Sequence, residues 1–294
     1  SPFTRSEIPN LLTDSIDEFF AVTAYAELVE ISRHPLDFCS GKGSVNISDM
    51  PTEALEFFGS FIAMDDPKHA RQRAIVARSF TPRKLQGVLD SVETICTEVI
   101  DDMCEKGEVD LVEAISQPFP LLVICDMMGI PRSEYATVLD ATNVILGGGD
   151  PEFLDGKDLI PALFEAGITL KTLMNELAAE RRANPTDDLT SKLVNAEHGE
   201  DMLTPDELGS FFILLAVAGN DTTRTATSLG MHLLGQNPDQ RAIWQDDIDG
   251  VTATAVDEIV RMASPVTYMR RTVTRPLTLS GQDFETGDRL IMFY

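Results

Sequence analysis

Apolar residues recur at intervals of three and four along most of the chain, which predicts a mainly helical protein. Between about residue 266 and the last residue the period falls to two, which predicts short strands. The expected fold class is therefore mainly α with a small β region. The pattern predicts helices over residues 22–33, 84–104, 116–128, 132–146, 159–182 and 189–196, a loop-rich stretch over 39–61, and a connector at 143–153, where three glycines follow one another.

The clearest helix start is the segment TPDE at positions 204–207. Thr204 is expected to be the N-cap, Pro205 the first helical residue, and Glu207 the reciprocal partner of a capping box. No further proline occurs before Pro238. The segment therefore predicts one helix over 205–236, about 48 Å long at 1.5 Å per residue.

This long helix contains an anomaly, the run FFILLAVAGNDTTR at positions 211–224. Ala218 and Gly219 leave a shallow place on the helix surface, where a flat ligand could approach the backbone. Asp221 and Thr222 beside it can open a helix turn and hold water, or relay protons. Composition alone favours a kink filled by structural water.

Three further pairs carry candidate chemistry. His69 and Arg73 are four residues apart on one predicted helical face. Between Pro67 and Leu89 there is no acidic residue, but there are six basic ones: Lys68, Arg71, Arg73, Arg78, Arg83 and Lys84. This local reversal of charge suits an anionic ligand group, an acidic protein partner or simply a solvated helix face. A second short helix is expected around 257–261, where Glu258 and Arg261 are three residues apart. Arg270 and Arg271 are neighbours in a predicted strand, so only one of them can face inward.

The bulk composition narrows the class of partner. The 294 residues carry a net charge of -25, which argues against nucleic acid and anionic membranes as general partners. None of the four cysteines forms a C-x-x-C pair, so a reducing, cytoplasmic environment is expected. No apolar run reaches the roughly 18–20 residues of a membrane span.

Taken together, these motifs resemble the haem-thiolate monooxygenases of the cytochrome P-450 superfamily, and most closely its soluble bacterial members. AGNDTT at 218–223 is similar to the family's A/G-G-x-D/E-T-T, EIVR at 258–261 to its E-x-x-R, and HARQR at 69–73 to its H-x-x-x-R. PVTYMRRT at 265–272 is similar to the segment that lines the pocket and supplies an Arg.

The resemblance implies roles for these residues. Haem b would lie over Ala218 and Gly219, and Asp221 with Thr222 would deliver protons during dioxygen cleavage. His69, Arg73 and Arg271 would pair with the haem propionates, and Glu258 with Arg261 would be structural. Electrons would come from NAD(P)H through a ferredoxin reductase and a ferredoxin, which would dock near the basic stretch that contains Arg71 and Arg78.

One departure from the family pattern matters. The haem-binding loop F-x-x-G-x-x-x-C-x-G is absent, so none of the four cysteines is a candidate iron ligand. The chain ends within the predicted strand GDRLIMFY and does not begin with Met. We therefore expect residues 1–294 to be a fragment of a single haem monooxygenase domain. The axial Cys is expected beyond Tyr294, and the fragment alone is expected to be inactive.

The expected substrate is lipophilic, because the candidate pocket residues are apolar. They are Ile62, Met64, Val144, Leu214, Val217 and Val266. The segments ICDMMGIP, TNVILGGGDP and SPVTYMRRT resemble actinobacterial members that hydroxylate the terminal carbon of methyl-branched lipids and sterol side chains. Two alternatives stay open, a non-catalytic helical carrier of lipophiles and an interaction scaffold in which the polar cluster is only a kink.

Overall fold

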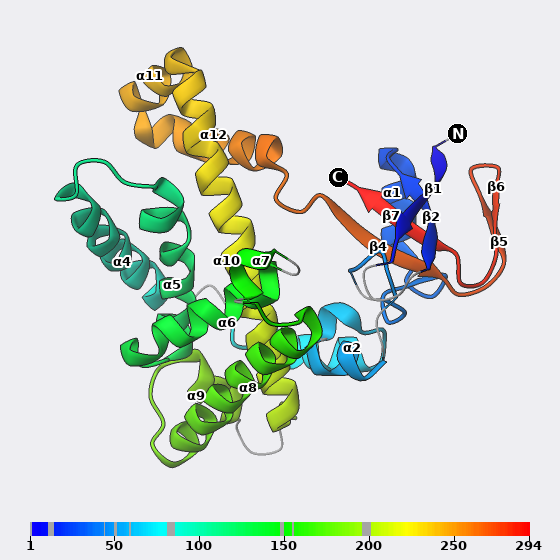
Figure 1. Cartoon of the computed structure of the whole chain (residues 1–294), viewed down its shortest axis with the longest axis horizontal. Helices are drawn as coiled ribbons and strands as arrows, with labels where there is room; N and C mark the ends of the chain where they lie inside the picture. Colours follow the sequence, from blue (N-terminus) through cyan, green and yellow to red (C-terminus); the bar gives the residue numbers. More distant parts are fainter. Residues whose placement is uncertain are drawn as a thin grey trace. The chain divides into compact units, whose positions relative to one another are not determined.

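The computed structural model describes residues 2–10, 15–43, 45–49, 52–58, 60–80, 86–147, 150–154, 156–195 and 201–294, with the side chains of 52, 53, 56, 86 and 87 left aside. It is mainly helical with a small β region, so the predicted fold class is confirmed. The chain forms two compact units (Figure 1). Unit 1 comprises Ser1–Ala74 and Val266–Tyr294, and unit 2 comprises Ile75–Pro265. That the whole chain forms one haem monooxygenase domain stays a prediction.

Unit 1 is built on a five-stranded sheet of order β1-β2-β7-β4-β3. Its strands are β1 (Phe3–Pro9), β2 (Ile16–Val22), β7 (Arg289–Phe293), β4 (Tyr268–Val273) and β3 (Phe38–Cys39). β2 and β7 are parallel, and the other neighbours are antiparallel. A separate hairpin contains β5 (Leu277–Leu279) and β6 (Gln282–Phe284), and the helical segments are α1 (Tyr25–Arg33), α2 (Thr52–Phe58), η1 (Phe61–Ala63) and the first part of α3 (Lys68–Ala77).

The core of unit 1 joins the two ends of the chain. Val22, Ile31, Leu290 and Met292 are completely buried in one apolar cluster, and the ring of Phe284 packs edge-on against that of Phe3. Since β2 pairs with β7, residues about 270 positions apart in sequence stabilise the same sheet.

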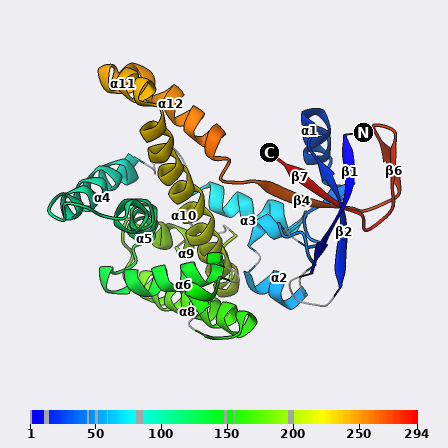
Figure 2. The ribbon, with the colours of Figure 1, turned by 45° about the horizontal axis from the view of Figure 1, so that its top comes forward.

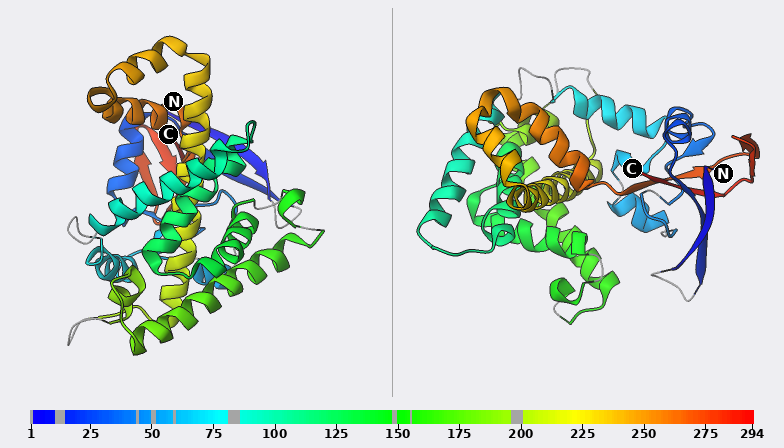
Figure 3. Two further views of the ribbon diagram at one scale, coloured as in Figure 1. Left: turned by 90° about the vertical axis from the view of Figure 1, so that its left-hand side faces the viewer. Right: turned by 90° about the horizontal axis from the view of Figure 1, so that it is seen from above.

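Unit 2 consists of helices packed around α10 (Pro205–Gln236) (Figure 2, Figure 3). The predicted capping box is present: the Thr204 hydroxyl accepts the Glu207 N–H, and the Glu207 carboxylate accepts the Thr204 N–H. α8 (Leu159–Ala183), α6 (Tyr135–Gly147) and α5 (Pro118–Met128) pack on α10, as do α11 (Pro238–Asp246) and α12 (Ile248–Ala263). The remaining elements are α4 (Gln86–Cys104), the π-helical turn η2 (Val112–Ser116), η3 (Arg132–Glu134), α7 (Pro151–Leu154) and α9 (Leu189–Val194).

Several expected boundaries were wrong. The helix expected from residue 22 begins at Tyr25, because Ile16–Val22 is a strand that pairs with β1 and β7. The loop-rich stretch 39–61 contains α2, and the expected connector at 143–153 is helical up to Gly147 and again from Pro151. The short helix around 257–261 is the end of the 16-residue α12, and α11 before it was not predicted.

In the described part of the chain, none of the helices combines the length and the apolar character that crossing a bilayer requires.

Candidate functional site

The candidate site residues lie in both units, and each group is described within its own unit. In unit 2, the acid and the alcohol lie in the middle of α10. The Thr222 hydroxyl donates to the Ala218 carbonyl oxygen at 2.9 Å, within the same helix. This bond to the preceding turn is common for helical Thr and can bend a helix. α10 is nevertheless helical throughout its 32 residues.

Asp221 has a partner that the motif did not indicate. The Arg224 guanidinium donates to its Oδ1 at 3.0 Å, and the two side chains are 22% and 40% exposed for Arg224 and Asp221, respectively. The signal was present in the sequence, because the pair has the i, i+3 spacing of a helical ion pair. Arg224 therefore orients the carboxylate that was expected to handle protons.

The small residues of the motif have different surroundings. Ala218 is exposed, so its methyl group leaves a shallow place on the surface of unit 2. A Cβ atom on Gly219 would lie 2.8 Å from Cδ1 of Ile124. The absence of a side chain at Gly219 thus allows α5 to approach α10, and Ala218 is the residue of the two that offers surface to a ligand.

Asn220 was not among the expected site residues. It is completely buried, and neither its Oδ1 nor its Nδ2 has a hydrogen-bond partner among the described residues. A buried amide without partners is destabilising. The stability of the fold therefore does not account for an Asn at this position, directly before Asp221.

The apolar pocket candidates are also divided between the units. In unit 2, Leu214 and Val217 lie on α10 and Val144 on α6, all partly buried, and these two helices pack on each other. In unit 1, Ile62 and Val266 are each 37% exposed, and Met64 is partly buried.

Two of the three cationic candidates of unit 1 lie on α3. Nδ1 of His69 is 3.3 Å from Oδ1 of Asp66, and its ring is near that of Phe61. Asp66 also accepts the Ala70 N–H at 3.1 Å. The Arg73 side chain is exposed. Arg83 and Lys84, of the same basic stretch, lie outside the described residues.

The two neighbouring arginines of β4 face opposite sides, as the strand pattern predicted. Arg270 is 2% exposed and donates to the Ile47 carbonyl oxygen at 2.9 Å and to Asp49 at 2.7 Å. Burial lowers its pKa, and the Asp49 carboxylate opposes that shift. Arg271 is only partly buried and donates to the Arg270 carbonyl oxygen. Arg271 is therefore the one of the two that can reach a ligand.

Glu258 and Arg261 form a two-point ion pair on α12, at 2.7 and 2.8 Å. The hydrogen bond from Arg261 holds the pKa of the Glu258 carboxyl below its usual value. Their side chains are 59% and 66% exposed. An exposed pair of this kind contributes little to stability by itself, and its bracing role stays a prediction.

The chemistry of these residues fits haem in part. An exposed guanidinium at Arg73 and a partly buried one at Arg271 are suitable partners for carboxylate groups such as propionates. The exposed Ala218 beside Asp221 and Thr222 offers a flat contact next to polar groups. Each within its own unit, Arg73 and Arg271 thus suit an anionic group and Ala218 suits a flat one. That these residues hold haem, as was also expected of His69 and Gly219, stays a prediction.

The two buried thiols, Cys39 and Cys125, are protonated near neutral pH. Burial raises the pKa of Cys125 to about 12, and burial also raises the pKa of Cys39. No group of three or more His, Cys, Asp or Glu residues in the described part of the chain could hold a metal ion.

Comparison with known proteins identifies the family. The family model for cytochrome P450 matches residues 159–294. A methyl-branched lipid omega-hydroxylase of Mycobacterium tuberculosis is 42% identical over 278 residues, and a steroid C26-monooxygenase of Mycolicibacterium smegmatis is 34% identical over 280. Each alignment covers 94% of this chain, but the chain spans only 64% of the length of these curated relatives. The cytochrome P450 CYP268A2 of Mycobacterium marinum, solved in complex with pseudoionone, superposes with a TM-score of 0.90 at 40% identity, over 99% of this chain and 71% of that one. The chain therefore belongs to the cytochrome P450 family of haem proteins.

Proposed function

We propose that the protein to which this chain belongs is a haem-dependent monooxygenase that hydroxylates a lipophilic substrate with dioxygen and two electrons. The observation that carries this proposal is the polar turn of α10, where Asp221 and Thr222 lie beside the exposed Ala218. Such an arrangement places a carboxylate and a hydroxyl next to an exposed small residue, against which a flat group can lie.

Asp221 and Thr222 are proposed to handle protons. Haem, when bound, supplies the activation of dioxygen. In the structure the Thr222 hydroxyl donates to the Ala218 carbonyl oxygen. Rotation about χ1 would redirect this donor from the helix to a ligand over Ala218. Asp221, held through Oδ1 by Arg224, has its other carboxylate oxygen available to return a proton to the hydroxyl.

The proposed substrate class is a methyl-branched lipid or a sterol side chain, hydroxylated at a terminal carbon. The names of the two mycobacterial relatives support this class. The six pocket candidates, all apolar, support a lipophilic ligand in general but do not distinguish the two lipids. Competition between a branched fatty acid and a sterol for the same protein would distinguish them.

The proposed electron donors are a ferredoxin and its reductase, supplied by NAD(P)H. Lys68 of α3 is an exposed cation in a chain of net charge -25, and it belongs to the same basic stretch as Arg71 and Arg78, which favours an acidic partner. Replacing Lys68 with Gln should slow reduction by a ferredoxin and reduce its dependence on salt.

The first test concerns the reading frame beyond Tyr294. We expect it to encode a Cys within a Phe- and Gly-rich loop, and we expect the complete protein, reduced under carbon monoxide, to absorb where haem with a thiolate ligand does. A frame without that Cys would overturn the proposal and favour a carrier of lipophiles.

The second test is Thr222→Ala in the complete, haem-loaded protein. Without the hydroxyl, electrons should be consumed at a similar rate but end as peroxide instead of hydroxylated product. Thr222→Ser, which keeps the hydroxyl, is the matched control. The proton role would be refuted if the alanine variant coupled electrons to product as efficiently as the serine variant.

A further inference from the structure

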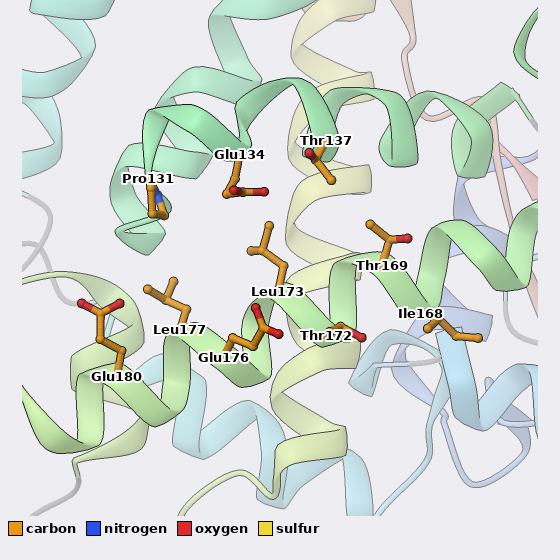
Figure 4. A pocket seen from close by; sticks show the side chains of 10 residues that line it. All are labelled: Pro131, Glu134, Thr137, Ile168, Thr169, Thr172, Leu173, Glu176, Leu177 and Glu180. Carbon is orange, nitrogen blue, oxygen red and sulfur yellow. The ribbon is translucent and has the colours of Figure 1, made fainter.

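A groove in unit 2 lies apart from the α10 turn. It runs between the start of α6, with η3 before it, and the second half of α8, and encloses about 520 Å³ (Figure 4). Small-molecule sites in proteins have volumes of roughly 300–1,000 Å³. None of the described residues that line it belongs to α10, so its occupation does not depend on the haem chemistry.

The groove combines an apolar surface with carboxylates. Leu173, Leu177 and Ile168 of α8 supply hydrocarbon, and Ile168 is 54% exposed. Figure 4 shows Glu134 on the α6 side of the groove and Glu176 on the α8 side, with Leu173 between the two helices. An occupant would therefore meet hydrocarbon and negative charge at the same place.

These carboxylates are not neutralised by cations nearby. Of the described residues, the ten that line the groove include no Lys, Arg or His. Arg132, next to the groove, gives its guanidinium to Glu98. Arg181 is bound to Asp188 and to the Gly129 carbonyl oxygen, and also reaches Glu180 at 2.9 Å. Glu134 and Glu176 have no ion pair within the described chain, so they remain available to a ligand.

The chemistry excludes some occupants. The described carboxylates do not gather into a group that could hold a metal ion. An anionic lipophile would bring its charge close to like charges, which is destabilising, whereas a cation would gain from both the carboxylates and the burial of its hydrocarbon.

We propose that the groove between α6 and α8 binds a hydrophobic organic cation, a substituted ammonium whose hydrocarbon body lies on Leu173 and Ile168 and whose charge lies between Glu134 and Glu176. Glu134 is partly buried and Glu176 is exposed, so their attraction for a cation should weaken as salt is added. The α8 hydrocarbon contributes in proportion to the apolar area that the ligand covers.

The test is isothermal titration of the purified 294-residue chain with decyltrimethylammonium, kept below its micelle concentration. One site per chain is expected. Tetramethylammonium, which lacks the hydrocarbon body, and decyl sulfate, which reverses the charge, should each bind much more weakly. The double variant Glu134→Gln, Glu176→Gln should weaken the binding of decyltrimethylammonium by about tenfold or more, because two negative charges beside the cation are removed.

The control carries the same loss of charge elsewhere in unit 2. Glu105→Gln, Glu108→Gln removes two exposed carboxylates beyond the end of α4 and should leave the affinity unchanged. Leu173→Asn should weaken binding without changing the charge, and circular dichroism will show whether each variant is folded. The proposal is overturned if both double variants weaken binding equally, which would mean that organic cations only adsorb to an acidic chain, or if decyl sulfate binds as tightly.

Discussion

The two halves of α10 differ sharply in their surroundings (Figure 1). In the first half Leu208, Phe211, Phe212 and Ile213 are at most 3% exposed. In the second half Leu229 is 40% exposed and Met231 is 51% exposed. The polar turn at Asp221 lies at the boundary between them. The first half is thus the more deeply buried one, although α11 and α12 also pack on α10, and the stability of unit 2 should depend mainly on the first half.

The largest expected effect is that of Phe212→Ala. Phe212 is completely buried, and loss of its ring leaves a cavity that neighbouring helices fill only in part. The free energy of unfolding should fall by about 3–5 kcal/mol. Urea unfolding followed by circular dichroism measures it.

Met231→Ala is the matched control on the second half and should change the free energy of unfolding by less than about 0.5 kcal/mol. Equal losses for the two variants would show that the comparison between the halves is wrong.

The next largest loss of stability is expected for the more buried of two ion pairs in unit 2. Arg181 and Asp188 are 12% and 10% exposed, whereas Arg261 and Glu258 are 66% and 59% exposed. Asp188→Asn leaves the buried Arg181 guanidinium with only the exposed Glu180 as a counter-charge, which should cost about 2–3 kcal/mol at pH 7. Glu258→Gln on the exposed pair should have no measurable effect.

The same pair predicts a dependence on pH. Burial alone would raise the pKa of the Asp188 carboxyl, but hydrogen bonds from Thr186, Ser191 and Arg181 outweigh it and lower the pKa below its usual value of 3.8. A carboxyl with a lowered folded-state pKa stabilises the fold above its unfolded pKa, and that stability is lost as the pH falls through the folded value. The difference in free energy of unfolding between the wild type and Asp188→Asn, measured by urea unfolding, should therefore be constant near neutrality and shrink below about pH 3.8. A difference independent of pH would exclude the ionised carboxylate as its source.

Local signals predicted α10 and the short strands after residue 266 well, and the N-terminal strands of unit 1 poorly. The capping box and the absence of proline fixed both ends of α10, because these signals act within a few residues. Strand β2 was assigned in part to a helix, because its pairing with β7 depends on residues such as Leu290, which no local pattern reveals. The start of α12 had a local signal that was missed, the Asp247 side chain that accepts the Gly250 N–H.

The candidate site shows the same limit. The motif located Asp221 and Thr222, but it could not show that the space at Gly219 belongs to Ile124 or that Asn220 is buried without partners. Those properties depend on which helices pack against α10, and packing between distant helices cannot be read from spacing along one of them.

A smaller effect is expected where the second half of α10 does touch a neighbour. A Cβ atom on Gly230 would lie 2.8 Å from Cγ2 of Ile259 on α12. Gly230→Leu should force the two helices apart and cost about 1–3 kcal/mol of unfolding free energy.

Gly235→Ala on the same half is its control. A Cβ atom there has nothing within 4 Å, and removal of a helical glycine should be neutral or stabilising by up to about 1 kcal/mol. If Gly230→Leu were also neutral, the contact between α10 and α12 would contribute nothing to the fold.

The smallest effect concerns the start of α10, where the buried half begins. Thr204→Ala removes the side chain that accepts the Glu207 N–H and should cost about 1 kcal/mol. Thr204→Ser keeps the acceptor and should cost only a few tenths of that. The cap lies at the end of α10 that is already packed, so its loss should lower the free energy of unfolding without allowing this end to unfold before the rest of unit 2. Circular dichroism reports the helices, and tryptophan fluorescence reports Trp244 on α11. The two signals should therefore show one common transition. An earlier loss of helical signal in the alanine variant would show instead that the first half of α10 can open independently of the second.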